Sequence, residues 1–342
     1  MGDKETTAIW RSRAPVRIDL AGGWTDVPPF STEVGGAVLN AAINRYAYVT
    51  ARLRDDPHIR IESADYDVTV EAPDADHLVY DGRLDLATAA IRRLNVRSGL
   101  ELFLRCDAPP GSGTGTSASM GVALLGLFNQ LQGAGLSTLE VASLANRLEI
   151  EELRNAGGKQ DQYVAALGGV CFLEFTDPHV VANRLELPPG IIAELEKHLV
   201  LCYTGKSRVS GNIINNVMGA YQRGNPSTVR ALHRLKAIAY EMKDALLAED
   251  IHSFSVLLQE NWENQKYLDP SVTNPHIDAL FEMALANGAV GGKATGAGGG
   301  GCVLFCAQSD REHTLRRALA ERGVVLLDFS LDFQGMTAWQ VR

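Results

Sequence analysis

The chain has 342 residues, of which 46% are hydrophobic and 21% charged, as in one large globular domain or two ordinary ones and unlike a disordered chain. Its formal net charge is -9 and it has no dense run of Lys and Arg, which argues against nucleic acid as a partner. It has neither an uncharged apolar run of membrane-spanning length nor a signal-peptide core after Met1, so we expect a cytoplasmic protein without a membrane partner.

The first part of the chain reads as strands interrupted by one helix. Apolar alternation and β-branched residues predict a strand over 9–18, a long strand over 36–53 and further strands over 59–71. A helix is expected over 84–94 and a strand over 100–104. A meander of strands followed by a loop and a helix is typical of an α+β fold and not of a doubly wound α/β fold.

The strand over 9–18 leads into a loop that contains Gly23, Trp24 and Asp26. Asp26 could accept hydrogen bonds from sugar hydroxyls, and Trp24 could stack on a sugar ring. The same spacing also fits a turn in which Asp26 caps local backbone N–H groups. The residues alone leave both interpretations open.

A glycine-rich loop at 109–119 is the most informative stretch of the chain. Its glycines alternate with small hydroxyl residues, and a hydrophobic helix follows at once. Such a loop lets backbone N–H groups come close to an anion, and the helix behind it adds the positive end of its dipole. The sequence therefore predicts a phosphate cradle formed by Pro110, Gly111, Ser112, Gly113, Thr114, Gly115, Thr116 and Ser117.

The segment after this loop concentrates polar and acidic residues. A second helix is expected over about 139–153, and its end carries Glu149, Glu151 and Glu152. An acidic helix end is usually a solvated face, but Lys-Gln-Asp-Gln at 159–162 crowds polar groups between a glycine turn and an apolar segment. Asp161 in that run could be held near Lys159 and remain ionised.

The second half of the chain begins after a Pro-Pro-Gly segment at 187–190. Strands are expected over 199–203, 302–306 and 324–332. Helices are expected over about 212–221, 229–248, 254–267 and 312–322. Between 291 and 301 lies another glycine-rich segment. It matches G-x-G-x-x-G but precedes a strand, so we interpret it as a close backbone approach to a ligand or to the first domain and not as a dinucleotide site.

Five cysteines complete the inventory of reactive side chains. No two of them have the Cys-x-x-Cys spacing, and most lie among apolar residues, so we expect buried free thiols in a reducing compartment. They are Cys106, Cys171, Cys202, Cys302 and Cys306.

Three segments, in order along the chain, resemble the three motifs of the GHMP kinase superfamily: Ala14–Gly23, Pro110–Ala118 and Lys293–Gly300. Together with Gly-Gly-Ala-Val-Leu-Asn at 35–40 and Gly-Lys-Gln-Asp-Gln-Tyr at 158–163, they are similar to D-glycero-D-manno-heptose 7-phosphate kinases and to the kinase part of L-fucokinases. The chain departs from the heptose 7-phosphate kinase pattern at Trp24, where many of those kinases have glycine. A tryptophan at this position is more similar to the fucokinase pattern. A bulky ring in this loop leaves the identity of the sugar open.

The resemblance implies a two-domain GHMP kinase fold. An N-terminal mixed β/α domain would bind ATP over residues 1–190, and a C-terminal ferredoxin-like α+β domain would occupy residues 191–342. It implies a monomer or homodimer that uses ATP and Mg²⁺ to phosphorylate the anomeric hydroxyl of a sugar or sugar phosphate. D-glycero-D-manno-heptose 7-phosphate is the expected acceptor, with L-fucose, glucose or galactose as alternatives. A non-catalytic sugar or nucleotide sensor on this scaffold is the competing hypothesis.

The resemblance also implies roles for individual residues. Asp161 would be the catalytic base and Arg17 would face the transferring phosphoryl group. Ser117 and Glu149 would bind Mg²⁺, with Glu151 or Glu152 as the alternative carboxylate. The residues expected at the acceptor are Gly23, Trp24, Asp26, Arg208, Gly298 and Gly299, of which Arg208 could bind a phosphate on the sugar.

Overall fold

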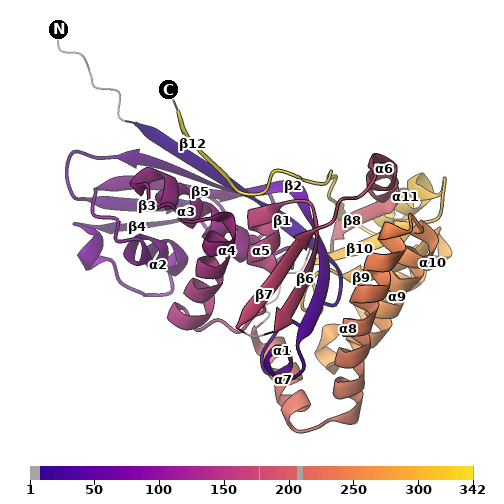
Figure 1. Ribbon diagram of the computed structural model, residues 1–342. Helices are drawn as coiled ribbons and strands as arrows, with labels where there is room; N and C mark the ends of the chain where they lie inside the picture. Colours follow the sequence, from indigo (N-terminus) through magenta and orange to yellow (C-terminus); the bar gives the residue numbers. More distant parts are fainter. Residues whose placement is uncertain (1–7, 177, 206–210, 342) are drawn as a thin grey trace.

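Two β-sheets organise the protein (Figure 1). The computed structural model describes residues 8–176, 178–205 and 211–341. The larger sheet has eight strands, in the order β12-β1-β2-β5-β3-β4, with β6 paired to β2 and β7 paired to β6. The smaller sheet has four strands in the order β11-β8-β10-β9. Among the described residues, no helix combines the length and hydrophobicity of a membrane span.

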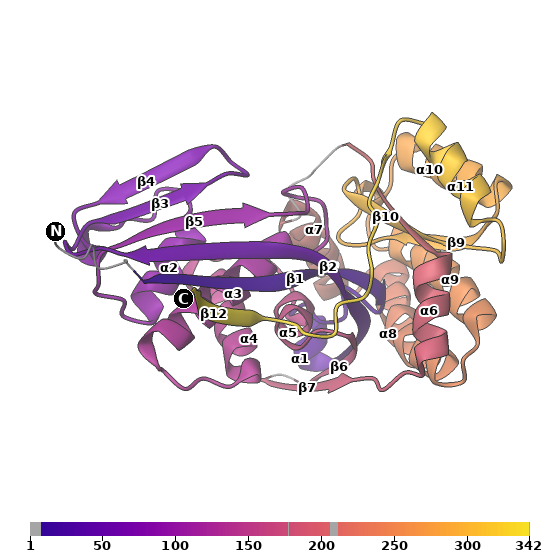
Figure 2. The ribbon, with the colours of Figure 1, turned by 90° about the horizontal axis from the view of Figure 1, so that it is seen from above.

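Helices of the first half of the chain pack on one face of the larger sheet (Figure 2), and the second half of the chain covers part of its other face. Its strands are β1 (Ile9–Ala21), β2 (Gly36–Leu53), β3 (Ile59–Ser63), β4 (Val68–Ala72), β5 (Leu100–Cys106), β6 (Val170–Thr176), β7 (His179–Arg184) and β12 (Thr337–Val341). The helices are α2 (Asp85–Arg93), α3 (Thr116–Gln132), α4 (Thr138–Arg147) and α5 (Gln160–Leu167), and a short helix α1 (Phe30–Glu33) follows β1. The capping box of Ser137 and Glu140 fixes the start of α4.

The long strand β2 has the bounds that the sequence predicts, and its burial explains its composition. The first half, which includes Ala37, Val38 and Leu39, is buried on both faces and pairs with β6. The second half pairs with β5 and alternates between buried and more exposed positions, because only one of its faces is covered. The strand therefore runs from the interior of the molecule out to an open sheet.

The smaller sheet lies among the helices of the second half of the chain. Its strands are β8 (Leu199–Tyr203), β9 (Ala289–Ala294), β10 (Cys302–Ala307) and β11 (Val325–Leu326). The helices are α6 (Pro189–His198), α7 (Gly211–Gln222), α8 (Pro226–Leu247), α9 (Ile251–Lys266), α10 (Pro275–Ala286) and α11 (Glu312–Glu321). All five cysteines are free thiols, as the sequence predicts.

One apolar cluster joins the two halves of the molecule. Strand β10 is buried throughout, and its residues alternate between two clusters. Leu304 packs in the cluster that contains Ile18 of β1 and Ile238 of α8, whereas Phe305 packs in another cluster with Phe281 of α10. The two halves thus share a core, in which side chains of β1 pack against α8 and β10.

The end of the chain differs from the sequence-based expectation. A strand over 324–332 was expected to close the second half, but only Val325–Leu326 pairs with β8. The chain then returns along the molecule, and β12 pairs antiparallel with β1 over residues 9–13 (Figure 2). This pairing satisfies the outer edge of β1, which would otherwise expose its backbone N–H and C=O groups. The last strand therefore belongs to the first sheet.

Candidate active site

A cleft of about 650 Å³ opens where β1, the glycine-rich loop and α5 converge. Strand β1 contributes Arg17 and Asp19, and the loop after it contributes Gly23, Trp24 and Asp26. Most of the residues to which the sequence assigned a catalytic, metal-binding or substrate role line this one cleft: Arg17, Gly23, Trp24, Asp26, Ser117, Glu149 and Asp161.

The glycine-rich loop forms one wall of the cleft. Gly111, Gly113 and Gly115 all have positive φ angles of 68° to 77°, in the left-handed region that favours glycine. Helix α3 begins directly behind them, so its free N–H groups point toward the loop. The hydroxyls of Ser112 and Thr114 are buried and hydrogen-bonded to each other at 2.7 Å, which stiffens the loop. The exposed backbone of the loop and the side chain of Ser117 are therefore the groups that could bind an anion.

The second glycine-rich segment supports this loop from behind. A Cβ on Gly296 would lie 3.0 Å from the Cα of Gly113, and Cys302 N donates to the carbonyl of Ser112 at 2.6 Å. The segment thus approaches the first half of the molecule, as one of the two interpretations expects, and its residues Gly296 and Ala297 also line the cleft. Gly298 and Gly299 lie against Val272 and not at the cleft wall, since Gly299 N donates to the Val272 carbonyl at 2.5 Å.

Arg17 and Asp161 form an ion pair at the centre of the cleft. Arg17 Nε donates to Asp161 Oδ1 at 2.8 Å, and Nη2 lies 2.7 Å from the same oxygen. Arg17 Nη1 donates to the carbonyls of Gly113 at 2.6 Å and Thr295 at 3.0 Å. The guanidinium is thus fixed against both glycine-rich segments and holds the carboxyl group in one orientation.

The second oxygen of Asp161 faces the glycine-rich loop. A Cβ on Gly115 would come 3.0 Å from Asp161 Oδ2, so a side chain at that position would crowd the carboxyl group. Burial raises the pKa of Asp161 above its ordinary value, while the Arg17 guanidinium opposes that rise. A carboxyl group with one oxygen held, one oxygen available and a raised pKa is suited to accept a proton.

Glu149 lies beside Ser117 at the mouth of the loop. It belongs to a π-helical turn (Leu148–Glu152) that continues α4, and such turns are frequent at functional sites. Ser117 Oγ donates to Glu149 Oε1, and Gln162 Nε2 donates to Oε2. One hydroxyl and one carboxyl group therefore meet here, a donor set that Mg²⁺ accepts when water completes its shell.

The two alternative carboxylates lie elsewhere. Glu151 accepts from Arg147 at 3.2 Å on the exposed side of the turn. Glu152 accepts from the Tyr80 hydroxyl at 3.2 Å. The geometry thus favours Glu149 over both.

Asp26 caps a helix from a distant part of the chain. Its Oδ2 accepts from the backbone N–H groups of Lys159 at 2.9 Å and Gln160 at 3.1 Å, and its Oδ1 accepts from the Gln160 amide at 3.3 Å. Asp26 therefore fixes the start of α5, which carries Asp161 in its first turn. The capping interpretation holds in this modified form, with a long-range partner in place of local N–H groups.

Burial raises the pKa of Asp26 from 3.8 to about 6, which predicts a pH-dependent effect of Asp26→Asn. The folded protein binds this proton more tightly than the unfolded chain, so stability falls as the pH rises from about 4 to about 6. The asparagine variant has no such proton and lacks this loss. We expect the stability of Asp26→Asn relative to the parent to rise over that window, by on the order of 3 kcal/mol, and to level off above it. Urea unfolding of both proteins at several pH values measures the difference, and a pH-independent difference would contradict the raised pKa.

Trp24 is held in a strained turn and is largely buried. Its φ is 84°, rare for a large side chain, and Thr25 N donates across the turn to the Gly22 carbonyl at 3.1 Å. The indole is 5% exposed and packs in an apolar cluster with Phe30 and Ile213. Trp24 thus anchors the loop that carries Asp26, and it also lines the cleft.

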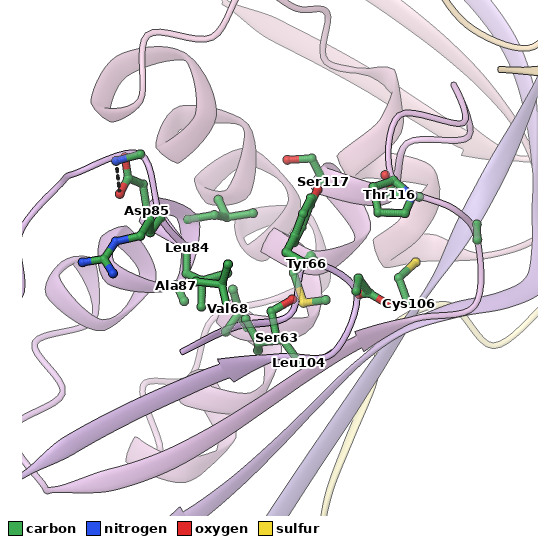
Figure 3. Close-up of a pocket in the computed structure, with 18 residues that line it drawn as sticks. Ser63, Tyr66, Val68, Leu84, Asp85, Ala87, Leu104, Cys106, Thr116 and Ser117 are labelled. Carbon is green, nitrogen blue, oxygen red and sulfur yellow. Dashed lines mark hydrogen bonds between the residues drawn. The ribbon is translucent and has the colours of Figure 1, made fainter. Parts of the chain in front are cut away.

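A second cavity, of about 380 Å³, adjoins the cleft and was missed by the sequence analysis (Figure 3). The two share Tyr66, Pro110, Thr116 and Ser117 as lining residues. Its other walls are mostly apolar and include Leu84, Leu86, Leu104, Met120 and Leu124. No local signal marks these residues, because they come from separate elements that meet only in the fold.

Arg208, expected to contact a phosphate on the acceptor, lies outside the described residues. Within the described part of the chain, no group of three or more His, Cys, Asp or Glu side chains is arranged to hold a metal ion. The Ser117–Glu149 pair, with its one carboxyl group, is therefore the candidate for a cation that keeps most of its water.

Comparison with known proteins places this geometry in context. The family described as GHMP kinases N terminal domain matches residues 83–169, and GHMP kinases C terminal matches residues 242–325. The chain is 32% identical, over 97% of its length and 99% of the relative's, to D-glycero-alpha-D-manno-heptose 7-phosphate kinase of Campylobacter jejuni. It is 30% identical over 92% of its length to L-fucokinase/L-fucose-1-P guanylyltransferase of Bacteroides fragilis, of which it covers 36%.

A solved structure shares the whole architecture. The crystal structure of a D-glycero-D-manno-heptose 1-phosphate kinase from Bacteroides thetaiotaomicron superposes with a TM-score of 0.82 at 31% identity. The match covers 97% of this chain and 99% of that one. The similarity therefore extends over both sheets.

Proposed function

We infer the reaction from one premise: the chain belongs to the GHMP kinase family. The resemblance seen in the sequence and the expected fold, with N- and C-terminal domains, are confirmed. The family consists of ATP-using kinases, and we propose that this member transfers the γ-phosphoryl group of ATP to a sugar hydroxyl. The domain boundary at 190/191 stays a prediction.

Two features support the proposed mode of ATP binding. The glycine-rich loop and the start of α3 present backbone N–H groups where phosphates would lie. The adjoining apolar cavity beside Tyr66 has the size and lining for a purine base, and it meets the loop at Thr116 and Ser117 (Figure 3). The base of ATP would then lie in the apolar cavity and its phosphates would lie beside the glycine-rich loop, in the adjoining cleft.

The Arg17–Asp161 pair supports the proposed mechanism more strongly than any other observation. Asp161 Oδ2, the oxygen not held by Arg17, would accept the proton as the sugar oxygen bonds to phosphorus and the bond to the leaving phosphate breaks. Arg17 would offset negative charge on the moving phosphoryl group. Mg²⁺, when held by Ser117 and Glu149, would supply further positive charge at the phosphates.

The role of Glu149 predicts a change in metal dependence. Glu149→Gln removes the carboxylate beside Ser117, so we expect the half-saturating Mg²⁺ concentration to rise about tenfold or more. Activity titrated with MgCl₂ at saturating ATP measures this shift. Glu151→Gln, two residues along the same turn, is the matched control and should keep the parental titration curve. An equal rise of the half-saturating Mg²⁺ concentration in both variants would contradict the assignment of Glu149 as a Mg²⁺ ligand.

We propose an anomeric hydroxyl as the acceptor, with D-glycero-D-manno-heptose 7-phosphate as the first candidate and L-fucose, glucose or galactose as alternatives. The relatives named as heptose phosphate kinases and L-fucokinase support this order. Release of ADP with heptose 7-phosphate, L-fucose, D-glucose, D-galactose and D-mannose identifies the substrate, and ³¹P NMR of the product identifies the phosphorylated position. ADP release with none of these sugars, despite ATP binding, would favour the sensor hypothesis.

A further inference from the structure

Asp19 and Lys293 form a buried ion pair directly behind the proposed acceptor site. Asp19 follows Arg17 by two positions on β1, so the two side chains lie on the same face of the strand. Lys293 Nζ, from β9, donates to Asp19 Oδ2 at 2.5 Å and to the Asp19 carbonyl at 3.0 Å. The side chains of Asp19 and Lys293 are 4% and 0% exposed. One oxygen of the carboxyl group is thus fully committed to the protein.

The other oxygen, Asp19 Oδ1, has no hydrogen-bond partner among the described residues. A buried carboxylate oxygen without a donor is costly, by roughly 1 to 3 kcal/mol or more. Asp19 lines the cleft next to Gly23, where a Cβ would come only 2.2 Å from Asp19 Oδ2. Only glycine at position 23 leaves the carboxyl group room at the cleft wall.

Two further residues of the cleft also carry a buried acceptor oxygen that has no partner among the described residues. Gln160 and Gln162 line it, and the Oε1 atoms of both lack partners among the described residues. Their NH₂ groups donate to Asp26 and Glu149, so the orientation of each amide is set by a carboxyl group. Three residues that line the cleft therefore each carry a buried acceptor oxygen without a partner in the described part of the chain, and a ligand rich in hydrogen-bond donors would satisfy them.

We propose that Asp19 is a specificity-determining residue that accepts a hydrogen bond, through Oδ1, from a ring hydroxyl of the sugar other than the one phosphorylated. The inference rests on the proposed sugar kinase activity and deepens it. A polyhydroxylated ring supplies several O–H donors within a small volume, and Asp19, Gln160 and Gln162 provide oxygens to receive them. Lys293 is a positioning residue, because it holds Oδ2 and leaves Oδ1 as the carboxyl oxygen that is unpaired among the described residues.

Deoxy sugars test the contact. The probe is whichever of heptose 7-phosphate, L-fucose, D-glucose, D-galactose and D-mannose gives the highest kcat/KM, together with its monodeoxy analogues at each ring carbon except the anomeric one. A site built to bond a hydroxyl rejects the analogue that lacks it. We expect the parent enzyme to lose about 10- to 100-fold in kcat/KM with one analogue through the Asp19 contact. In Asp19→Asn, the penalty for that analogue should fall at least about fivefold, while the penalties for the other analogues stay the same.

A purely structural role for Asp19 gives a different pattern. The variant would then lose activity equally with the parent sugar and every analogue, and all ratios would be unchanged, which would overturn the proposal. Because each ratio is measured within one protein, partial unfolding does not change it.

A second variant guards against misfolding. Asp19→Asn leaves a buried lysine without its counter-charge, whereas Asp19→Leu/Lys293→Met removes both charges and the acceptor oxygen and should be better tolerated. The double variant should show the same loss of discrimination, and a parental pattern in it would also overturn the proposal. If the parent enzyme phosphorylates none of the five sugars, the proposed function itself has failed, and that outcome is distinct from unchanged ratios in an active enzyme.

Discussion

Asp161→Asn is expected to lower kcat by about 100- to 10,000-fold with the preferred sugar, the range typical for loss of a general base. Asparagine retains an oxygen that Arg17 can bond at the Oδ1 position. Its amide NH₂ takes the place of Oδ2 beside Gly115 and cannot accept a proton. The loss should therefore appear in kcat, and ATP binding measured by calorimetry should stay near the parental value.

The pH profile gives an independent check on this residue. The parent should lose kcat/KM on the acid side as Asp161 becomes protonated, at a pH above the ordinary range of an aspartate because burial raises its pKa. The pH profile of Asp161→Asn should lack this decrease in kcat/KM on the acid side. Asp310→Asn, which changes an exposed ion pair with Lys197, is the matched control and should be fully active. Turnover by Asp161→Asn at the parental rate would refute the base assignment.

Gly158→Ala should lower both the activity and the stability of the protein. An added Cβ would lie 1.9 Å from Asp26 Oδ2 and 2.4 Å from its Cγ, so the carboxyl group or the backbone at 158 must move. Either movement breaks the bonds from Asp26 to the start of α5 and displaces Asp161. Because a misplacement of about 1 Å can cost a hundredfold in rate, we expect kcat to fall at least about that far, with a lower Tm.

The preceding glycine provides the control for that substitution. A Cβ on Gly157 meets no atom within 4 Å, although Gly157 also lines the cleft. Gly157→Ala should therefore keep the parental Tm and a kcat close to that of the parent. Similar losses in both variants would show that the glycines act through chain flexibility and not through the contact with Asp26.

Sequence patterns could predict the parts of this protein that depend on neighbouring residues. The strand over 36–53, the glycine-rich loop with α3 behind it, and the strand over 199–203 all follow from local alternation and composition, and the structure has them. Other elements lacked such a signal. Strand β9 contains two adjacent glycines and reads as a loop, but it forms because β10 pairs with it. Helix α10 did carry a usable signal, since Asn274 caps a helix with Pro275 at its first position.

The residues of the candidate site also fall into those that the sequence could indicate and those that only the structure shows. Asp161 and Ser117 could be singled out because each lies in an unusual local run, and the family resemblance added Arg17 and Glu149. The Asp19–Lys293 pair, the Asp26 cap on α5 and the cavity beside Tyr66 join residues that are far apart in the chain. No spacing rule links such residues, so only the fold could reveal them.

The return of β12 to the edge of β1 affects how the protein is made. As the polypeptide leaves the ribosome, β1 emerges long before its outer neighbour, which comes from residues 337–341. Until those residues have been made, the nascent chain therefore has an unprotected strand edge that can pair with another molecule. A fusion partner or tag that hinders the docking of those residues should lower the soluble yield more than it lowers the specific activity of the molecules that mature.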